Sequence, residues 1–130
     1  MGRRRDDAID LACRRWAAER RKLLGLDHPQ KAREFLGAVR STLGQRRDLH
    51  AGSTSVGRIE QHFPEVYTGD AFDVNRAYWL ARPRVKAMLD VHYVARAPIA
   101  VKAGWMAVSV PQYFVELKVA KAFVEGRLAA

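Results

Sequence analysis

The sequence predicts an all-α domain of about six helices. Apolar residues recur at spacings of three and four along most of the chain, and no segment alternates polar and apolar residues as a half-buried strand does. A length of 130 residues fits one compact domain. We expect basic helices over residues 1–50, a long loop over 51–69, and a helical part over 70–130 that ends in a helix-turn-helix at about 98–128.

Two helices are expected in the N-terminal part. The first runs from Asp6 to Leu24, and its apolar stripe consists of Ile9, Cys13, Trp16, Leu23 and Leu24. Gly25 suits its end, because glycine adopts the left-handed conformation without strain. The second runs from about Pro29 to Leu49, with proline in the first turn, where its missing N–H costs nothing. Its stripe consists of Ala32, Phe35, Leu36, Val39 and Leu43.

Residues 51–69 interrupt the helical pattern. The segment begins with small and polar residues and contains the breakers Phe63-Pro64 and Thr68-Gly69. We expect a long loop here with one short turn around Ile59–His62, and loops of this length tend to be functional or mobile. Periodic patterns resume after it and predict helices over 70–80, 83–94, 98–106 and 110–128.

The last two helices have the spacing of a helix-turn-helix, a motif that presents its second helix to a DNA major groove. Ser109 and Gln112 form a capping box that predicts a helix start. The residues expected to lock the crossing are Ala103, Met106, Val108, Ser109, Tyr113, Leu117 and Ala120. Ala107 departs from the pattern, because the turn usually carries glycine there. A plain helical hairpin is the alternative interpretation.

Charge favours a polyanionic partner. The chain holds 23 Lys and Arg against 14 Asp and Glu, a net charge of +9, and both ends are basic whereas the middle is slightly acidic. At this size such a charge favours nucleic acid, although solubility alone is the other explanation. Arg3, Arg4 and Arg5 are expected to form a mobile electrostatic arm.

Little in the sequence points to an enzyme, a metal or a membrane. The four histidines show no ligand-like spacing, no carboxylate pair stands out as acid and base, and no glycine-rich phosphate loop is present. We therefore expect neither catalytic residues nor a metal or other cofactor. The lone Cys13 is expected to be buried and inert, and with one thiol the chain is interpreted as intracellular and reduced. No membrane span or signal peptide is expected.

The C-terminal half resembles phage antitermination proteins of the Q type. The matching residues, within 64–128, are Tyr67-Thr68-Gly69-Asp70-Ala71, His92-Tyr93-Val94, Val101-Lys102-Ala103, Val108-Ser109 and Tyr113-Phe114-x-x-Leu117-x-x-Ala120. The tail of that family carries a helix-turn-helix similar to the fourth region of bacterial sigma factors. The resemblance implies a protein of the bacterial host cytoplasm that binds double-stranded DNA near a promoter. There it loads onto a paused RNA polymerase that still holds sigma, so that the enzyme reads through terminators.

The DNA-binding residues expected on this interpretation are one base reader and seven phosphate contacts. They are Gln112 as the base reader, with Lys118, Lys121, Lys102, Arg96, Arg84, Lys86 and Arg82. Two alternative functions stay open: a sigma-like or repressor-type DNA-binding regulator, and a helical adaptor that does not bind DNA.

The last helix is apolar nearly all round, so it should bury more than one face. We favour packing against the N-terminal helices. The alternative is a protein contact through Phe114 and Val115, with polymerase or with a second copy of the chain. We expect the start of the helix to read DNA, and Phe123 and Val124 to be packed.

Overall fold

The computed structural model describes residues 2–44 and 55–129, and every regular element within them is helical. This confirms the all-α fold. The elements are α1 (Gly2–Leu24), α2 (Pro29–Gly44), α3 (Ser55–His62), the 3-10 turn η1 (Pro64–Val66), α4 (Asp70–Leu80), α5 (Pro83–Leu89), the π-helical turn η2 (Asp90–Val94), α6 (Ile99–Trp105) and α7 (Val110–Ala129). Among these residues, no helix is both long enough and apolar enough to cross a bilayer.

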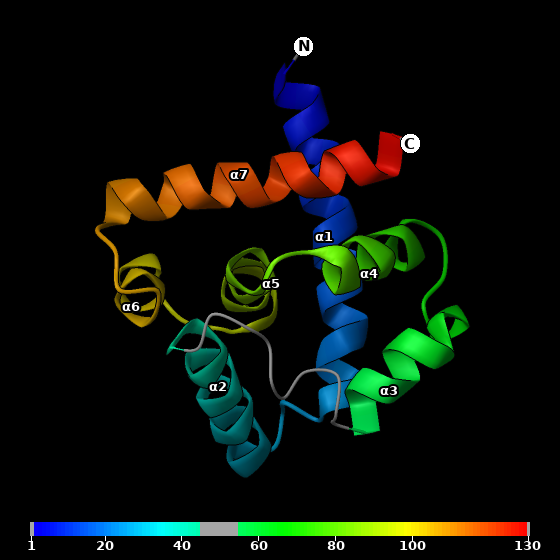
Figure 1. Cartoon of the computed structure of the whole chain (residues 1–130), viewed down its shortest axis with the longest axis horizontal. Coiled ribbons are helices and arrows are strands. Elements are labelled where there is room, and N and C mark those ends of the chain that lie inside the picture. The colour runs from blue at the N-terminus through cyan, green and yellow to red at the C-terminus, as the bar shows by residue number, and fades with distance from the viewer. Residues whose placement is uncertain (1, 45–54, 130) are drawn as a thin grey trace.

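The helices surround a single hydrophobic core. In Figure 1, α1 runs down the middle of the molecule, α7 crosses its upper half, and α2 and α3 lie on either side of its lower end. Helices α5 and α6 are seen nearly end-on below α7, so both run at a steep angle to it. The largest fully buried apolar side chains come from α1, α4, α5 and α7, together with two loop positions: Trp16, Tyr67, Tyr78, Met88, Leu89, Met106 and Tyr113. The two basic ends of the sequence therefore share one core.

The loop expected over 51–69 is wrong over most of its described part, because α3 and η1 lie within Ser55–Val66. The short turn expected around Ile59–His62 is the end of α3. Ser55 and Gly57 have poor helix propensity, but tertiary contacts override it. Glu60 is fully buried against other helices, and such an anchor fixes the segment. Residues 51–54, and the expected end of the second helix at Leu49, lie outside the described residues.

The expected arm at Arg3–Arg5 is also corrected, because α1 begins at Gly2 and includes these residues. The five residues before Ala8 are arginines and aspartates, and no proline interrupts the segment. Arginine is a good helix former, so nothing local ends the helix before Gly2.

The end of α1 matches the prediction at Gly25, whose φ is +67°. The amide of Leu26 donates to the carbonyl of Arg21 at 3.1 Å, and the amide of Gly25 donates to the carbonyl of Lys22 at 3.2 Å. This pair of bonds is the Schellman arrangement, which satisfies the last free carbonyls of a helix. Cys13 is fully buried, and burial together with the charge of Asp10 raises the pKa of its thiol to about 12.

Candidate nucleic-acid interface

A left-handed residue makes the turn between α6 and α7. Ala107 has a φ of +58°, which an L-residue adopts at a cost of about 1–2 kcal/mol. The amide of Val108 donates to the carbonyl of Ala103 at 3.1 Å, and the amide of Ala107 donates to the carbonyl of Gly104 at 3.1 Å. Helix α6 therefore ends in the same Schellman arrangement as α1, with alanine where glycine is usual. The two helices are separate, as the helix-turn-helix pattern requires.

Ser109 caps the start of α7. Its Oγ accepts a hydrogen bond from the amide of Gln112 at 3.2 Å, and its carbonyl accepts one from the amide of Tyr113 at 2.8 Å. These are the bonds of an N-cap residue, which replaces partners that the first helical amides lack. The predicted boundary of the helix is confirmed, and Gln112 lies in its first turn.

The residues expected to lock the crossing lie where the motif needs them. Ala103, Met106, Tyr113, Leu117 and Ala120 are buried. Val108 is partly buried, and Ser109 is exposed at the cap. Five of the seven side chains are thus buried, as a locked crossing requires.

The hydroxyl of Tyr113 lies 2.8 Å from Nδ1 of His92, which ties α7 to the π-helical turn η2. Burial, followed by the positive charge of Lys102, lowers the pKa of His92 to about 4. At neutral pH the ring is therefore uncharged.

Arg84, one of the expected phosphate contacts, is exposed, and its guanidinium already has partners within the protein. Its Nε donates to Oε1 of Glu116 at 2.6 Å, and its Nη2 donates both to Oε2 of Glu116 at 3.0 Å and to the carbonyl of Met106 at 3.1 Å. A guanidinium fork matches a carboxylate in this two-bond geometry. Arg84 therefore connects α5, the turn and α7.

Two of the expected phosphate contacts are buried. Lys102 is 7% exposed, and its Nζ donates to the carbonyl of His92 at 2.8 Å. Lys86 is 6% exposed, and its Nζ lies 4.1 Å from the centre of the Trp79 ring. Long lysine stems cover apolar surface readily, which a sequence pattern does not reveal. Neither residue presents its charge to a phosphate.

The other expected contacts remain available at the surface to different degrees. Gln112 and Lys118 are exposed on α7, Arg96 is exposed before α6, and Arg82 is exposed before α5. Lys121 is only partly exposed, and its Nζ lies 3.9 Å from Oδ1 of Asp10 on α1. Gln112, Lys118, Arg96 and Arg82 are thus exposed and available to contact a ligand.

Packing of Phe114 and Val115, which we favoured, is wrong. Their exposed fractions are 49% and 54%, and that of Val119 is 58%. The buried face of α7 consists of Tyr113, Leu117, Ala120 and Val124, and Phe114 and Val115 lie outside it. The expected packing of Val124 is confirmed, and Phe123 is partly buried against the core.

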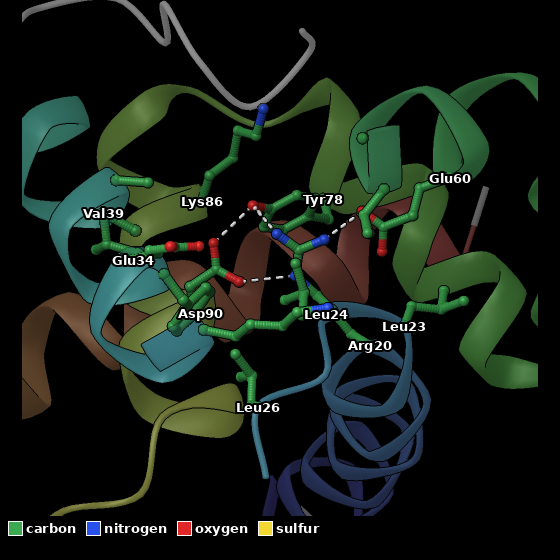
Figure 2. A pocket seen from close by; sticks show the side chains of 16 residues that line it. Arg20, Leu23, Leu24, Leu26, Glu34, Val39, Glu60, Tyr78, Lys86 and Asp90 are labelled. Carbon is green, nitrogen blue, oxygen red and sulfur yellow. Dashed lines mark hydrogen bonds and ion pairs between the residues drawn. The ribbon is translucent and has the colours of Figure 1, made fainter. Parts of the chain in front are cut away.

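A buried charged cluster around Arg20 was missed by sequence reasoning (Figure 2). Arg20 of α1 donates from Nε to Oδ1 of Asp90 at 2.9 Å and forms an ion pair with Glu60 of α3. The hydroxyl of Tyr78 donates to Oδ2 of Asp90 at 2.6 Å, and the hydroxyl of Tyr67 donates to Glu60. Burial alone would lower the pKa of Arg20, but Asp90, Tyr78 and Glu60 outweigh it and raise the pKa well above its usual value.

One signal for this cluster was present in the sequence. Arg20 follows Trp16 by four residues, on the same stripe as Cys13, so helical spacing alone places it in the core. The cluster lines one wall of a cavity of about 290 Å³, whose other walls are mostly apolar side chains of α1 and α2. Arg20 contacts α3, α4 and η2 at once, which makes the cluster a connector of the fold.

Comparison with known proteins returned no relatives: no family model, no curated protein and no solved structure matches this chain.

Proposed function

We propose that this chain binds double-stranded DNA through α6, the turn at Ala107 and α7, and acts as a transcription antitermination factor of the phage Q type. The observation that carries the proposal is the turn itself. Ala107 adopts the left-handed conformation, and Ser109 caps the following helix. The left-handed alanine makes a tight turn between α6 and α7. A tight turn between two helices is also the feature by which helix-turn-helix motifs present their second helix to DNA.

The surroundings of the turn support the same function. Arg84 fixes α7 against α5, so the reading helix is held rigidly. Gln112 is exposed in the first turn, where recognition helices meet base edges, and Lys118 is exposed further along the helix. The net charge of +9 attracts a polyanion.

The effect on elongation rests on the resemblance of residues 64–128 to the Q-type family. It is tested by transcription in vitro. Duplexes that bind the protein are first selected from a random library, and the best site is placed beside a promoter upstream of a terminator. We expect bacterial polymerase holoenzyme to read through more often with the protein, and only on the template that carries the site.

Two results would reject parts of this proposal. Site-specific binding without read-through would favour a sigma-like or repressor-type regulator. Absence of DNA binding at low salt would favour a helical adaptor, for which the exposed Phe114 and Val115 offer a surface.

A further inference from the structure

The exposed side of the first three turns of α7 is more apolar than is usual for a helix that reads DNA. It consists of Val110, Pro111, Gln112, Phe114, Val115, Lys118 and Val119, here called the outer face. We propose, on the basis of the DNA-binding function above, that the outer face recognises A·T base pairs by covering thymine methyl groups. The expected ligand is therefore a DNA duplex with thymines at the contacted positions.

The chemistry of the groove selects this ligand. The thymine 5-methyl is the one apolar group that base pairs display in the major groove, and apolar side chains are its usual partners. Phe114, Val115 and Val119 each leave about half of their surface in water. Covering a methyl group with them removes apolar area from water on both sides.

Charge favours DNA over a second protein on this face. Between Val110 and Ala122 the sole acidic residue is Glu116, and Arg84 holds both of its oxygens. Lys118 is the exposed charge that remains near Phe114 and Val115 in the helix. A second copy of the chain would carry the same charge of +9 and be repelled, whereas a polyanion is attracted.

Gln112 supplies the polar part of the recognition. A glutamine side chain can bond both N6 and N7 of adenine, the partner of thymine. The exposed positions from Val110 to Val115 hold no arginine or lysine, the side chains that most often recognise guanine. This first part of the outer face therefore lacks the usual means to select G·C pairs, and Lys118 lies beyond it.

The test replaces thymine by deoxyuridine, which removes the methyl and keeps the hydrogen-bonding groups. The best duplex selected from a random library is synthesised in both forms, and binding is measured by fluorescence anisotropy. We expect affinity to fall about fourfold for each covered methyl that is removed. Phe114→Ala and Val115→Ala should lose this discrimination. Val66→Ala, a matched change at an exposed valine of η1, should keep it. Thermal melting of each variant verifies its folding.

Each other outcome contradicts a distinct claim. Equal affinity for the thymine and deoxyuridine duplexes overturns methyl recognition, while DNA binding stands. In a second outcome, Phe114→Ala and Val115→Ala both still prefer the thymine duplex over the deoxyuridine duplex while read-through is lost. This result also overturns methyl recognition, and it assigns the outer face to a protein partner. Failure to bind any duplex at low salt overturns the proposed function itself.

Discussion

Arg84 and Glu116 form a two-bond ion pair that joins α5 to α7, at 2.6 and 3.0 Å. The same guanidinium also donates to the carbonyl of Met106, the residue before the left-handed turn. One side chain thus fixes the helix that precedes the motif, the turn within it and the helix that we propose reads DNA. The hydrogen bond to Glu116 is the main cause that raises the pKa of Arg84.

The first prediction concerns this pair. In a double-mutant cycle of Arg84→Ala and Glu116→Ala, we expect a coupling energy of about 1 kcal/mol, because the pair is two-pronged but partly exposed. Urea unfolding of the four proteins measures it. A coupling near zero would show that the two side chains do not hold α5 and α7 together.

The second prediction concerns the turn. Ala107→Gly should raise the free energy of unfolding by about 1 kcal/mol, because glycine adopts a positive φ without strain. Ala100→Gly, at an exposed position within α6, is the control and should lower it by about 0.5–1 kcal/mol. The same sign for both variants would mean that Ala107 is not left-handed in solution.

The third prediction concerns the buried cluster. Arg20→Ala should cost about 3–5 kcal/mol, because Glu60 and Asp90 would remain buried without their cation. Arg15→Ala on the same helix removes a 2.8 Å ion pair with Asp70, but that pair is exposed and should cost at most about 1 kcal/mol. Thermal and urea unfolding measure both variants. Similar losses of stability in Arg20→Ala and Arg15→Ala would contradict the account of the cluster.

The fourth prediction concerns pH. The pKa of His92 is about 4 in the folded chain, below its ordinary 6.5, so the unfolded chain binds the proton first. Its contribution to stability is therefore complete above pH 6.5 and is lost as the pH falls toward 4. We expect about 1–2 kcal/mol from this group, after allowance for its partial exposure. Urea unfolding across this range should show a smaller loss for His92→Gln; identical curves would reject the assignment.

The helices were predictable because their apolar stripes follow the period of the α-helix. The turn was predictable because Ser109 and Gln112 have capping spacing around it. Helix α3 was not predicted, since its anchor is the ion pair of Glu60 with Arg20, forty positions away in the sequence. Local patterns carry no information on such a partner.

The candidate interface was predicted only in part, and for a related reason. Residue type places Lys86 and Lys102 among surface cations, but their long side chains reach back to a ring and to a carbonyl. Arg84 is exposed, but a carboxylate holds its guanidinium. The opposite error was made for Phe114 and Val115, which were expected to be packed because they are apolar but are exposed. Helix α7 has one core to cover, and Tyr113, Leu117, Ala120 and Val124 already fill that face.

The fifth prediction, the salt dependence of DNA binding, tests the central claim most directly. We expect the affinity for a duplex, measured by anisotropy, to fall steeply between about 50 and 200 mM salt, with a log–log slope near −0.9 for each phosphate contact. Lys118→Ala on α7 should make the slope shallower by about 0.9. Lys31→Ala, which removes the same charge from an exposed position of α2, should leave it unchanged. An affinity that does not vary with salt, or equal changes in the two variants, would contradict DNA binding through α7.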